Sequence, residues 1–206
     1  MNLQELSVKE FIDKVTGNDP VPGGGSVSAL NGSLAASLAA MVANLTVGRK
    51  KYAEVNDEME QISARMTEQS AKLLADVDRD AEAYDRVFAA FKLPKETDEE
   101  KAVRKEAIQR ETKYAAEVPM EVARTASALL PMIDAANSNA VTDATVAMMC
   151  ARTAVIGALL NVRINLTSIT DEAFVKTMTE EADRLEAAAM EAEHKLLEYV
   201  KAHAFN

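Results

Sequence analysis

Residues 20–48 read "PVPGGGSVSALNGSLAASLAAMVANLTVG", and no charged side chain interrupts the stretch. After the run of glycines, Ala, Ser, Val and Leu dominate, which favours a helix that packs closely against its neighbours through small side chains. The stretch is also long enough to suggest a membrane span. The glycines, the prolines beside them and several polar side chains oppose that interpretation: Ser28, Asn31, Ser33, Ser37, Asn44 and Thr46. We therefore expect a helix buried inside protein, and no membrane partner.

Capping signals place the first two helices. Ser7 and Glu10 form a capping box that predicts a short helix ending at about Gly17. Ser26 can cap the helix of small residues, which is expected to end near Gly48 because glycine favours helix C-termini.

Polar breaks divide the rest of the chain. "KLPKETDEEK" (92–101) and "NSNAVTD" (137–143) interrupt helical patterns, and Pro119 is expected at or near the start of a further helix. The last helix begins near Thr170, with Asp171 in its first turn. No alternating strand pattern or internal repeat is present. The helical patterns cover about 55–91, 98–117, 119–136, 143–166 and 170–203. The prediction is an all-α bundle in a single domain, residues 1–206.

Composition narrows the class of protein. The formal net charge is -10, which argues against a general nucleic-acid binder because such proteins need a basic face. Cys150 is the only cysteine, so an intrachain disulfide is impossible and a reducing compartment is favoured. The first residues, "MNLQELSVKEF", carry acids early and do not resemble a secretory signal. We therefore expect a cytoplasmic location.

One carboxylate lies where a helix should pack. In "LLADVDRDAEAYDRVFAAF" (73–91), steps of three and four place these residues on one stripe: Leu73, Val77, Asp80, Tyr84, Val87 and Phe91. The neighbouring acids Asp78, Glu82 and Asp85 are expected on a solvated face. Burial of Asp80 should raise its pKa, which prepares a carboxylate for general acid–base chemistry. The simpler alternative is a buried Asp that caps a neighbouring helix or pairs with an Arg.

The glycine run has two interpretations. "PVPGGGS" before a helix can present backbone N–H groups to an anion, but it lacks the spacing of a nucleotide-binding loop. The alternative is a tight turn for close packing. Arg49, Lys50 and Lys51 follow the uncharged helix, where cations favour a helix C-terminus; they can also clamp a carboxylate or phosphate.

Two amides and one acid complete the candidates. Asn161 and Asn165 are four residues apart on one helix face, so they hold either a neighbouring helix or a ligand. Asp143 is most simply the N-cap of this helix. His194 and His203 are the only histidines, and no metal-ligand spacing is convincing, so we expect neither a metal nor a redox cofactor.

Taken together, seven stretches resemble the cyclodeaminase domain of formiminotransferase-cyclodeaminase and its stand-alone relatives, the bacterial methenyltetrahydrofolate cyclohydrolases. The matching stretches are "PVPGGGSVSAL" (20–30), "GRKKY" (48–52), "VDRDAEAY" (77–84), "LPKETDEEK" (93–101), "TDATVA" (142–147), "NVRINL" (161–166) and "ITDEAF" (169–174). The resemblance implies a multihelical antiparallel bundle that dimerises, with a folate site close to the subunit interface.

The resemblance also assigns roles. It implies that Asp80 is the proton acceptor, which is the residue that the stripe singles out. The loop that lines the site would be Gly23, Gly24, Gly25 and Ser26. Arg49 and Lys50 would lie near the anionic tail of the folate, and Asp143 near its ring.

The chain carries no formiminotransferase domain, which favours a cyclohydrolase that converts 5,10-methenyltetrahydrofolate to 10-formyltetrahydrofolate. The alternatives are a formiminotetrahydrofolate cyclodeaminase, which releases ammonia, and a helical dimer that binds folate without turnover. In each case the folate is the ligand, and no separate cofactor is expected.

Overall fold

The computed structural model describes residues 2–136 and 140–203, and within them every regular element is a helix and no strand is present. The elements are the 3-10 helices η1 (Leu3–Glu5) and η2 (Lys50–Val55) and the α-helices α1 (Val8–Val15), α2 (Gly24–Thr46), α3 (Asn56–Phe91), α4 (Asp98–Ala136), α5 (Val141–Leu166) and α6 (Glu172–His203). The all-α prediction is confirmed.

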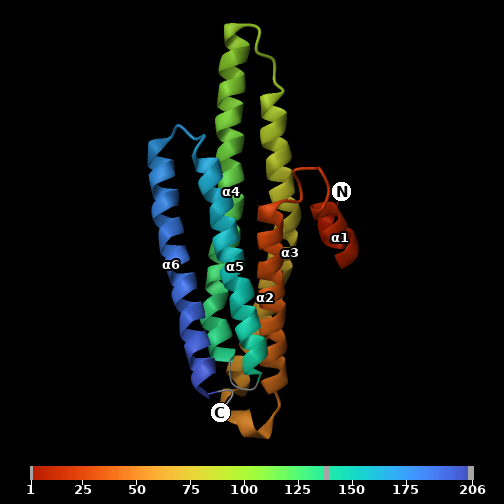
Figure 1. The fold of residues 1–206 in the computed structure, drawn as a ribbon, viewed down its shortest axis with the longest axis vertical. Helices are drawn as coiled ribbons and strands as arrows, with labels where there is room; N and C mark the ends of the chain where they lie inside the picture. Colours follow the sequence, from red (N-terminus) through yellow and green to blue (C-terminus); the bar gives the residue numbers. More distant parts are fainter. Residues whose placement is uncertain (1, 137–139, 204–206) are drawn as a thin grey trace.

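Figure 1 shows the long helices α2 to α6 in an up-and-down arrangement. α2 and α5 lie side by side and run in opposite directions, with α3 and α4 packed against them and α6 along one outer edge. The short α1 lies beside the beginning of α2. The beginning of α2 and the end of α5 share one end of the pair, whereas η2 and the beginning of α5 lie at the other.

Small side chains hold α2 close to its neighbours. Its buried residues are almost all Ala, Ser and Gly. A Cβ at Gly32 would lie 3.1 Å from Leu73 of α3, and the Ser33 hydroxyl lies 3.0 Å from the Ser70 hydroxyl on the same helix. At this separation side chains of α3 reach the backbone of α2.

Two predicted helix boundaries are wrong. The patterns 98–117 and 119–136 form one continuous helix, α4, because Pro119 is buried where α4 packs into the bundle and tertiary packing outweighs its low helix propensity. Ser26 does not cap α2: Gly23 occupies that position and Ser26 lies inside the first turn.

The predicted positions of two acidic residues relative to the helix starts were also wrong. α5 begins two residues before Asp143, which lies in its first turn while Ala140 is the N-cap. Conversely, Asp171 precedes α6 and accepts a hydrogen bond from the Phe174 amide at 3.1 Å, which is the N-cap geometry. The capping box of Ser7 and Glu10 is confirmed.

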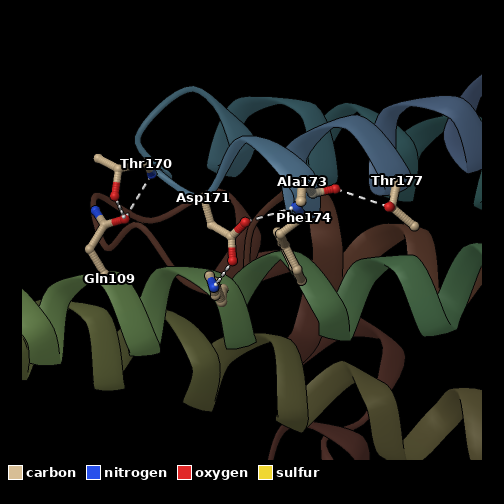
Figure 2. A network of polar contacts seen from close by, with 7 residues as sticks. Gln109, Thr170, Asp171, Ala173, Phe174 and Thr177 are labelled. Carbon is tan, nitrogen blue, oxygen red and sulfur yellow. Dashed lines mark hydrogen bonds and ion pairs between the residues drawn. The ribbon is translucent and has the colours of Figure 1, made fainter.

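The connection between α5 and α6 is fastened to α4. Gln109 accepts hydrogen bonds from the backbone and the hydroxyl of Thr170, and Asp171 forms an ion pair with Lys113, as Figure 2 shows. The pKa of Asp171 is lowered, first by its hydrogen bond with Lys113 and then by the Phe174 amide. These contacts fix the end of α5 relative to α4.

α2 and α5 are long and apolar enough to cross a membrane, judged by length and composition alone. Within the bundle, however, 61% of the most apolar window of α2 and 50% of that of α5 are buried by other helices, and core helices of soluble proteins pass the same test.

Candidate functional site

A pocket of about 310 Å³ lies where the beginning of α2 meets α3, α4 and the end of α5. Its polar groups come from the glycine run, Asp80, Asn161 and Asn165, and the remaining lining is apolar or aromatic: Pro20, Val21, Ala83, Tyr84, Val87, Ala115 and Ile164. A small apolar cavity with a few convergent polar groups is the usual form of a small-molecule site.

Asp80 lies directly against the glycine run. A Cβ built on Gly25 would stand 2.0 Å from Asp80 Oδ1, a distance that no side chain tolerates, whereas a Cβ on Gly24 would stand 3.3 Å from the Asn161 amide nitrogen. Gly25 is therefore the position that lets the carboxylate reach the first turn of α2. The glycine run is more than a turn, because it admits a titratable group from another helix.

Ser26 is the hydrogen-bond partner of Asp80. Its hydroxyl lies 3.0 Å from Asp80 Oδ2 and 3.0 Å from the carbonyl oxygen of Val77. Burial raises the pKa of Asp80, and hydrogen bonds from the side chain and backbone of Ser26 oppose the rise. The structural alternative is therefore confirmed in part, because the carboxyl serves the N-terminus of a neighbouring helix. Asp80 also lines the pocket, and its role in acid–base chemistry stays a prediction.

A second carboxyl lies one turn earlier on α3. Asp76 is fully buried, and burial raises its pKa, although the adjacent Arg79 opposes the rise. Arg79 bridges Asp76 and Glu121 at 2.8 and 2.9 Å. Asp76 is not among the residues that line the pocket, so a raised pKa alone does not single out Asp80; its place in the pocket does.

The two asparagines are oriented by backbone carbonyls. Asn161 Nδ2 donates to the Gly157 carbonyl, while Asn165 Nδ2 donates to the carbonyls of Asn161 and Ala115 at 2.9 and 2.8 Å. The Ala115 carbonyl lacks the usual helical donor because Pro119, four residues later, has no N–H. With both N–H groups of Asn165 engaged, its side-chain oxygen remains as an acceptor at the pocket.

The structure assembles only some of the predicted site residues. Gly23, Gly24, Gly25, Asp80, Asn161 and Asn165 line the pocket, and Ser26 lies behind Asp80. Arg49, Lys50 and Asp143 are not brought to it within one chain. They lie at the other end of α2, which is about 34 Å long, since a helix rises about 1.5 Å per residue. Their roles in folate binding stay predictions.

Sequence reasoning did not assign the apolar and aromatic lining of the pocket, and two of these residues are informative, Tyr84 and Ala115. Tyr84 belongs to the stripe that contains Asp80 and stacks on Phe88, with the ring centroids 6.3 Å apart, so the stripe itself was the available signal. The backbone carbonyl of Ala115 accepts a hydrogen bond from Asn165. The available signal in the sequence was Pro119, four residues later, which has no N–H to donate to that carbonyl.

A larger pocket of about 490 Å³ lies between α1 and the bundle. Its lining is apolar except for Gln4 and Thr16, and no ionisable side chain contributes to it. Asp78 borders this region and accepts from the Leu3 amide at 2.6 Å, which secures η1 to α3 and corrects the expectation that Asp78 faces solvent. Of these two pockets, only the smaller one has an ionisable side chain in its lining.

Comparison with known proteins identifies the family. The family model described as formiminotransferase-cyclodeaminase matches residues 7–184. The chain belongs to this family. It is 35% identical over 199 residues to the methenyltetrahydrofolate cyclohydrolase of Methylorubrum extorquens, covering 95% of this chain and 96% of that protein.

Two further relatives of this formiminotransferase-cyclodeaminase family member carry other names. The formimidoyltransferase-cyclodeaminase of Rattus norvegicus is 36% identical over 177 residues, and the match spans 84% of this chain but only 33% of the rat protein. The crystal structure of formiminotetrahydrofolate cyclodeaminase from Thermotoga maritima superimposes with a TM-score of 0.87 at 33% identity, covering 98% of this chain and 100% of that one.

Gly25→Ala tests the contact on which this family member's pocket depends. Alanine in a helix is favoured over glycine by about 0.5–1 kcal/mol, but displacing the Asp80 carboxyl should outweigh that gain, since overpacking costs about 1–3 kcal/mol. We expect a net loss of unfolding free energy for Gly25→Ala in urea denaturation. Gly24→Ala, whose Cβ meets only a rotatable amide, is the control and should be neutral or stabilising. Equal effects of the two substitutions would contradict the assignment.

Proposed function

We propose that the protein is a methenyltetrahydrofolate cyclohydrolase, which hydrolyses 5,10-methenyltetrahydrofolate to 10-formyltetrahydrofolate. The observation that carries the proposal is the Asp80 carboxyl, partly buried, hydrogen-bonded to Ser26 and facing a pocket lined with amides. Likeness over nearly the whole length of the Methylorubrum extorquens cyclohydrolase favours this activity.

The substrate carries a positive charge shared between N5, N10 and the carbon that bridges them. Water attacks the bridging carbon, which forms the new carbon–oxygen bond. As it does so, the water loses one proton to Asp80. The intermediate then collapses: the bond from carbon to N5 breaks, Asp80 returns the proton to N5, and the hydroxyl proton leaves to solvent. Ionised Asp80 also attracts the substrate cation, so one carboxylate serves both steps.

Ser26 is suited to hold Asp80 in both protonation states. Its hydroxyl carries one hydrogen but has two acceptors at 3.0 Å, Val77 O and Asp80 Oδ2. While Asp80 is ionised, Ser26 donates to it. Once Asp80 has taken the proton from water on its other oxygen, the hydroxyl rotates to Val77 O, and the acid proton stays directed at the substrate for transfer to N5. No heavy atom has to move during the transfer.

The pocket can hold the folate ring by its polar edges. The pterin ring offers N–H donors, and the side-chain oxygens of Asn161 and Asn165 are acceptors positioned by their own hydrogen bonds. Tyr84 supplies an aromatic surface at the same pocket. We place the reacting carbon of the substrate between Asp80 and these groups. We also propose that the protein is a homodimer and that it is cytoplasmic.

Formiminotetrahydrofolate cyclodeaminase is the second candidate, favoured by the Thermotoga maritima structure, which also matches over the full chain. In that reaction N10 attacks the formimino carbon and ammonia leaves, so the same carboxylate can move the proton. A folate-binding dimer without turnover is the third candidate. Loss of the near-ultraviolet absorbance of methenyltetrahydrofolate identifies the first activity, ammonia release the second, and binding without either the third.

Asp80→Asn should abolish the catalysed step. The amide keeps the size of the side chain but cannot accept the proton, and general base catalysis contributes about 10²–10⁴-fold. We expect kcat for methenyltetrahydrofolate hydrolysis, corrected for the uncatalysed rate, to fall by at least about 10²-fold. Asp85→Asn, an exposed acid on the same helix, is the control. Wild-type turnover by Asp80→Asn would remove Asp80 as the base.

Ser26→Ala should change the pH dependence of hydrolysis. Asp80 must be ionised to act, so activity falls as the pH drops through its raised pKa. Removing the Ser26 hydroxyl deletes a hydrogen bond that favours the ionised form, so the pKa should rise further and the acidic limb of kcat/KM should move to higher pH. Ser28→Ala, whose hydroxyl bonds to the Gly24 carbonyl, is the control. An unmoved acidic limb would show that Ser26 does not tune Asp80.

A further inference from the structure

The end of α3 extends past the beginning of α2. Figure 1 shows the α3–α4 hairpin projecting beyond the other helices. Asp80 meets α2 at Gly25, in its first turn, whereas α3 continues to Phe91, about three turns further along. Beyond Asp80, therefore, α2 no longer covers the side of α3 that it covers earlier.

Aromatic side chains follow Asp80 on this part of α3. Tyr84, Phe88 and Phe91 come at steps of four, four and three residues, and they are 41%, 49% and 50% exposed. The rings of Tyr84 and Phe88 stack, with an interplanar angle of 14°. We call these three residues the aromatic ledge. Exposed apolar patches that are rimmed by polar side chains mark ligand-binding or interaction surfaces.

Two cations lie over the outer rings of the aromatic ledge. Lys92 Nζ is 4.1 Å from the centroid of the Phe88 ring, and the guanidinium of Arg104, on α4, is 5.6 Å from that of Phe91. Arg104 also donates to the Phe91 carbonyl at 3.1 Å, which holds it at the end of α3. Within residues 2–136 and 140–203 neither cation belongs to an ion pair, so both can pair with an anionic ligand.

The aromatic ledge begins in the pocket, because Tyr84 is one of the lining residues. The pocket volume of about 310 Å³ is close to the lower limit of about 300 Å³ for sites that hold drug-sized ligands. This volume suits the fused ring of a folate, so the rest of the molecule has to leave the pocket. The ledge is an apolar surface that continues from the pocket and carries cations at its far end.

We propose that the aromatic ledge binds the p-aminobenzoylglutamate tail of the substrate, with the benzoyl ring on Phe88 and the glutamate carboxylates at Lys92 and Arg104. The identity of this ligand rests on the proposed function. N10 of the substrate carries the benzoyl ring, so a reacting carbon beside Asp80 brings that ring to the adjoining turns of α3. The order of residues along α3 then matches the order of groups in the substrate: reacting carbon, aromatic ring and carboxylates.

The positions of the charges also orient the substrate. A cation beside Asp80 would pair with the carboxylate and repel the positively charged carbon. Lys92 follows Asp80 by twelve residues, or about 18 Å at 1.5 Å per residue, so it can attract the tail without holding the base ionised. The positive end of the substrate is drawn towards Asp80 and the negative end towards the far end of the ledge.

Phe88→Ala and Lys92→Gln test the aromatic ledge in the full-length protein. Both side chains are exposed, so neither substitution should disturb folding. We expect each to raise KM for methenyltetrahydrofolate about three- to tenfold, because a stacked ring or a charge-assisted hydrogen bond is lost. The value of kcat should change by less than about twofold, since the tail is bound equally before and during the reaction.

Two matched controls separate the ledge from general effects of the substitutions. Tyr199→Ala removes an exposed, stacked ring from α6, and Lys105→Gln removes an exposed charge from the α3–α4 hairpin. Both controls should keep the wild-type KM. A KM that is unchanged in Phe88→Ala and Lys92→Gln, or raised equally in the controls, would overturn the proposal.

Binding of the tail alone gives a measurement that needs no turnover. Saturation-transfer NMR with p-aminobenzoylglutamate should show binding to the wild-type protein and to Tyr199→Ala, and an affinity about three- to tenfold weaker for Phe88→Ala. No transfer to the wild-type protein, equal affinity of Phe88→Ala, or a loss only in a variant with both Arg49→Gln and Lys50→Gln would overturn the ledge.

Turnover by the wild-type protein is measured first, so failure of the proposed function would appear there, before any variant is made. Binding of p-aminobenzoylglutamate that depends on Phe88 would in that case still support the aromatic ledge as a site for the tail. Turnover without such binding would instead leave the proposed function standing and contradict the ledge.

Discussion

The close approach of Asp80 to the first turn of α2 is the contact on which the site depends. It needs the glycine at position 25, because a Cβ there would overlap the carboxyl, and it needs α2 and α3 to pack closely. Gly32 against Leu73 and Ser33 against Ser70 supply that closeness. The small residues further along α2 therefore influence the site without contacting it, because they set the separation between α2 and α3 at which Asp80 lines the pocket.

Asp76 and Asp80 lie one turn apart on α3, and their different hydrogen-bond partners suit one to a structural role and the other to a chemical one. Burial raises the pKa of both. Asp76 meets Arg79, which holds it in an ion pair inside the bundle. Among the described residues, the side chain that bonds to Asp80 is that of Ser26, a hydroxyl that can donate or accept. A cation would fix the charge of Asp80 permanently. A neutral partner leaves the carboxyl able to gain and lose a proton, which a general base requires.

The fold and the central residue could be predicted because both leave periodic marks in the sequence. Helical spacing located the long helices, although it divided α4 in two, and the stripe around Asp80 identified an acid that lines the pocket. The errors arose where tertiary contacts decide. Nothing local reveals that Pro119 continues a helix, or that its missing N–H leaves the Ala115 carbonyl to Asn165. Likewise Ser26 is a residue type that favours the N-cap position, yet Gly23 is the N-cap of α2 and Ser26 forms a hydrogen bond with Asp80.

Arg49 and Lys50 show a further limit of prediction from sequence, because residues near each other in the chain can lie far apart in the fold. Their distance from Gly25 is small in sequence, but a straight helix converts 23 residues into about 34 Å, so proximity in the chain becomes separation along the bundle. A single chain cannot fold back over that length without breaking the helix that the packing requires.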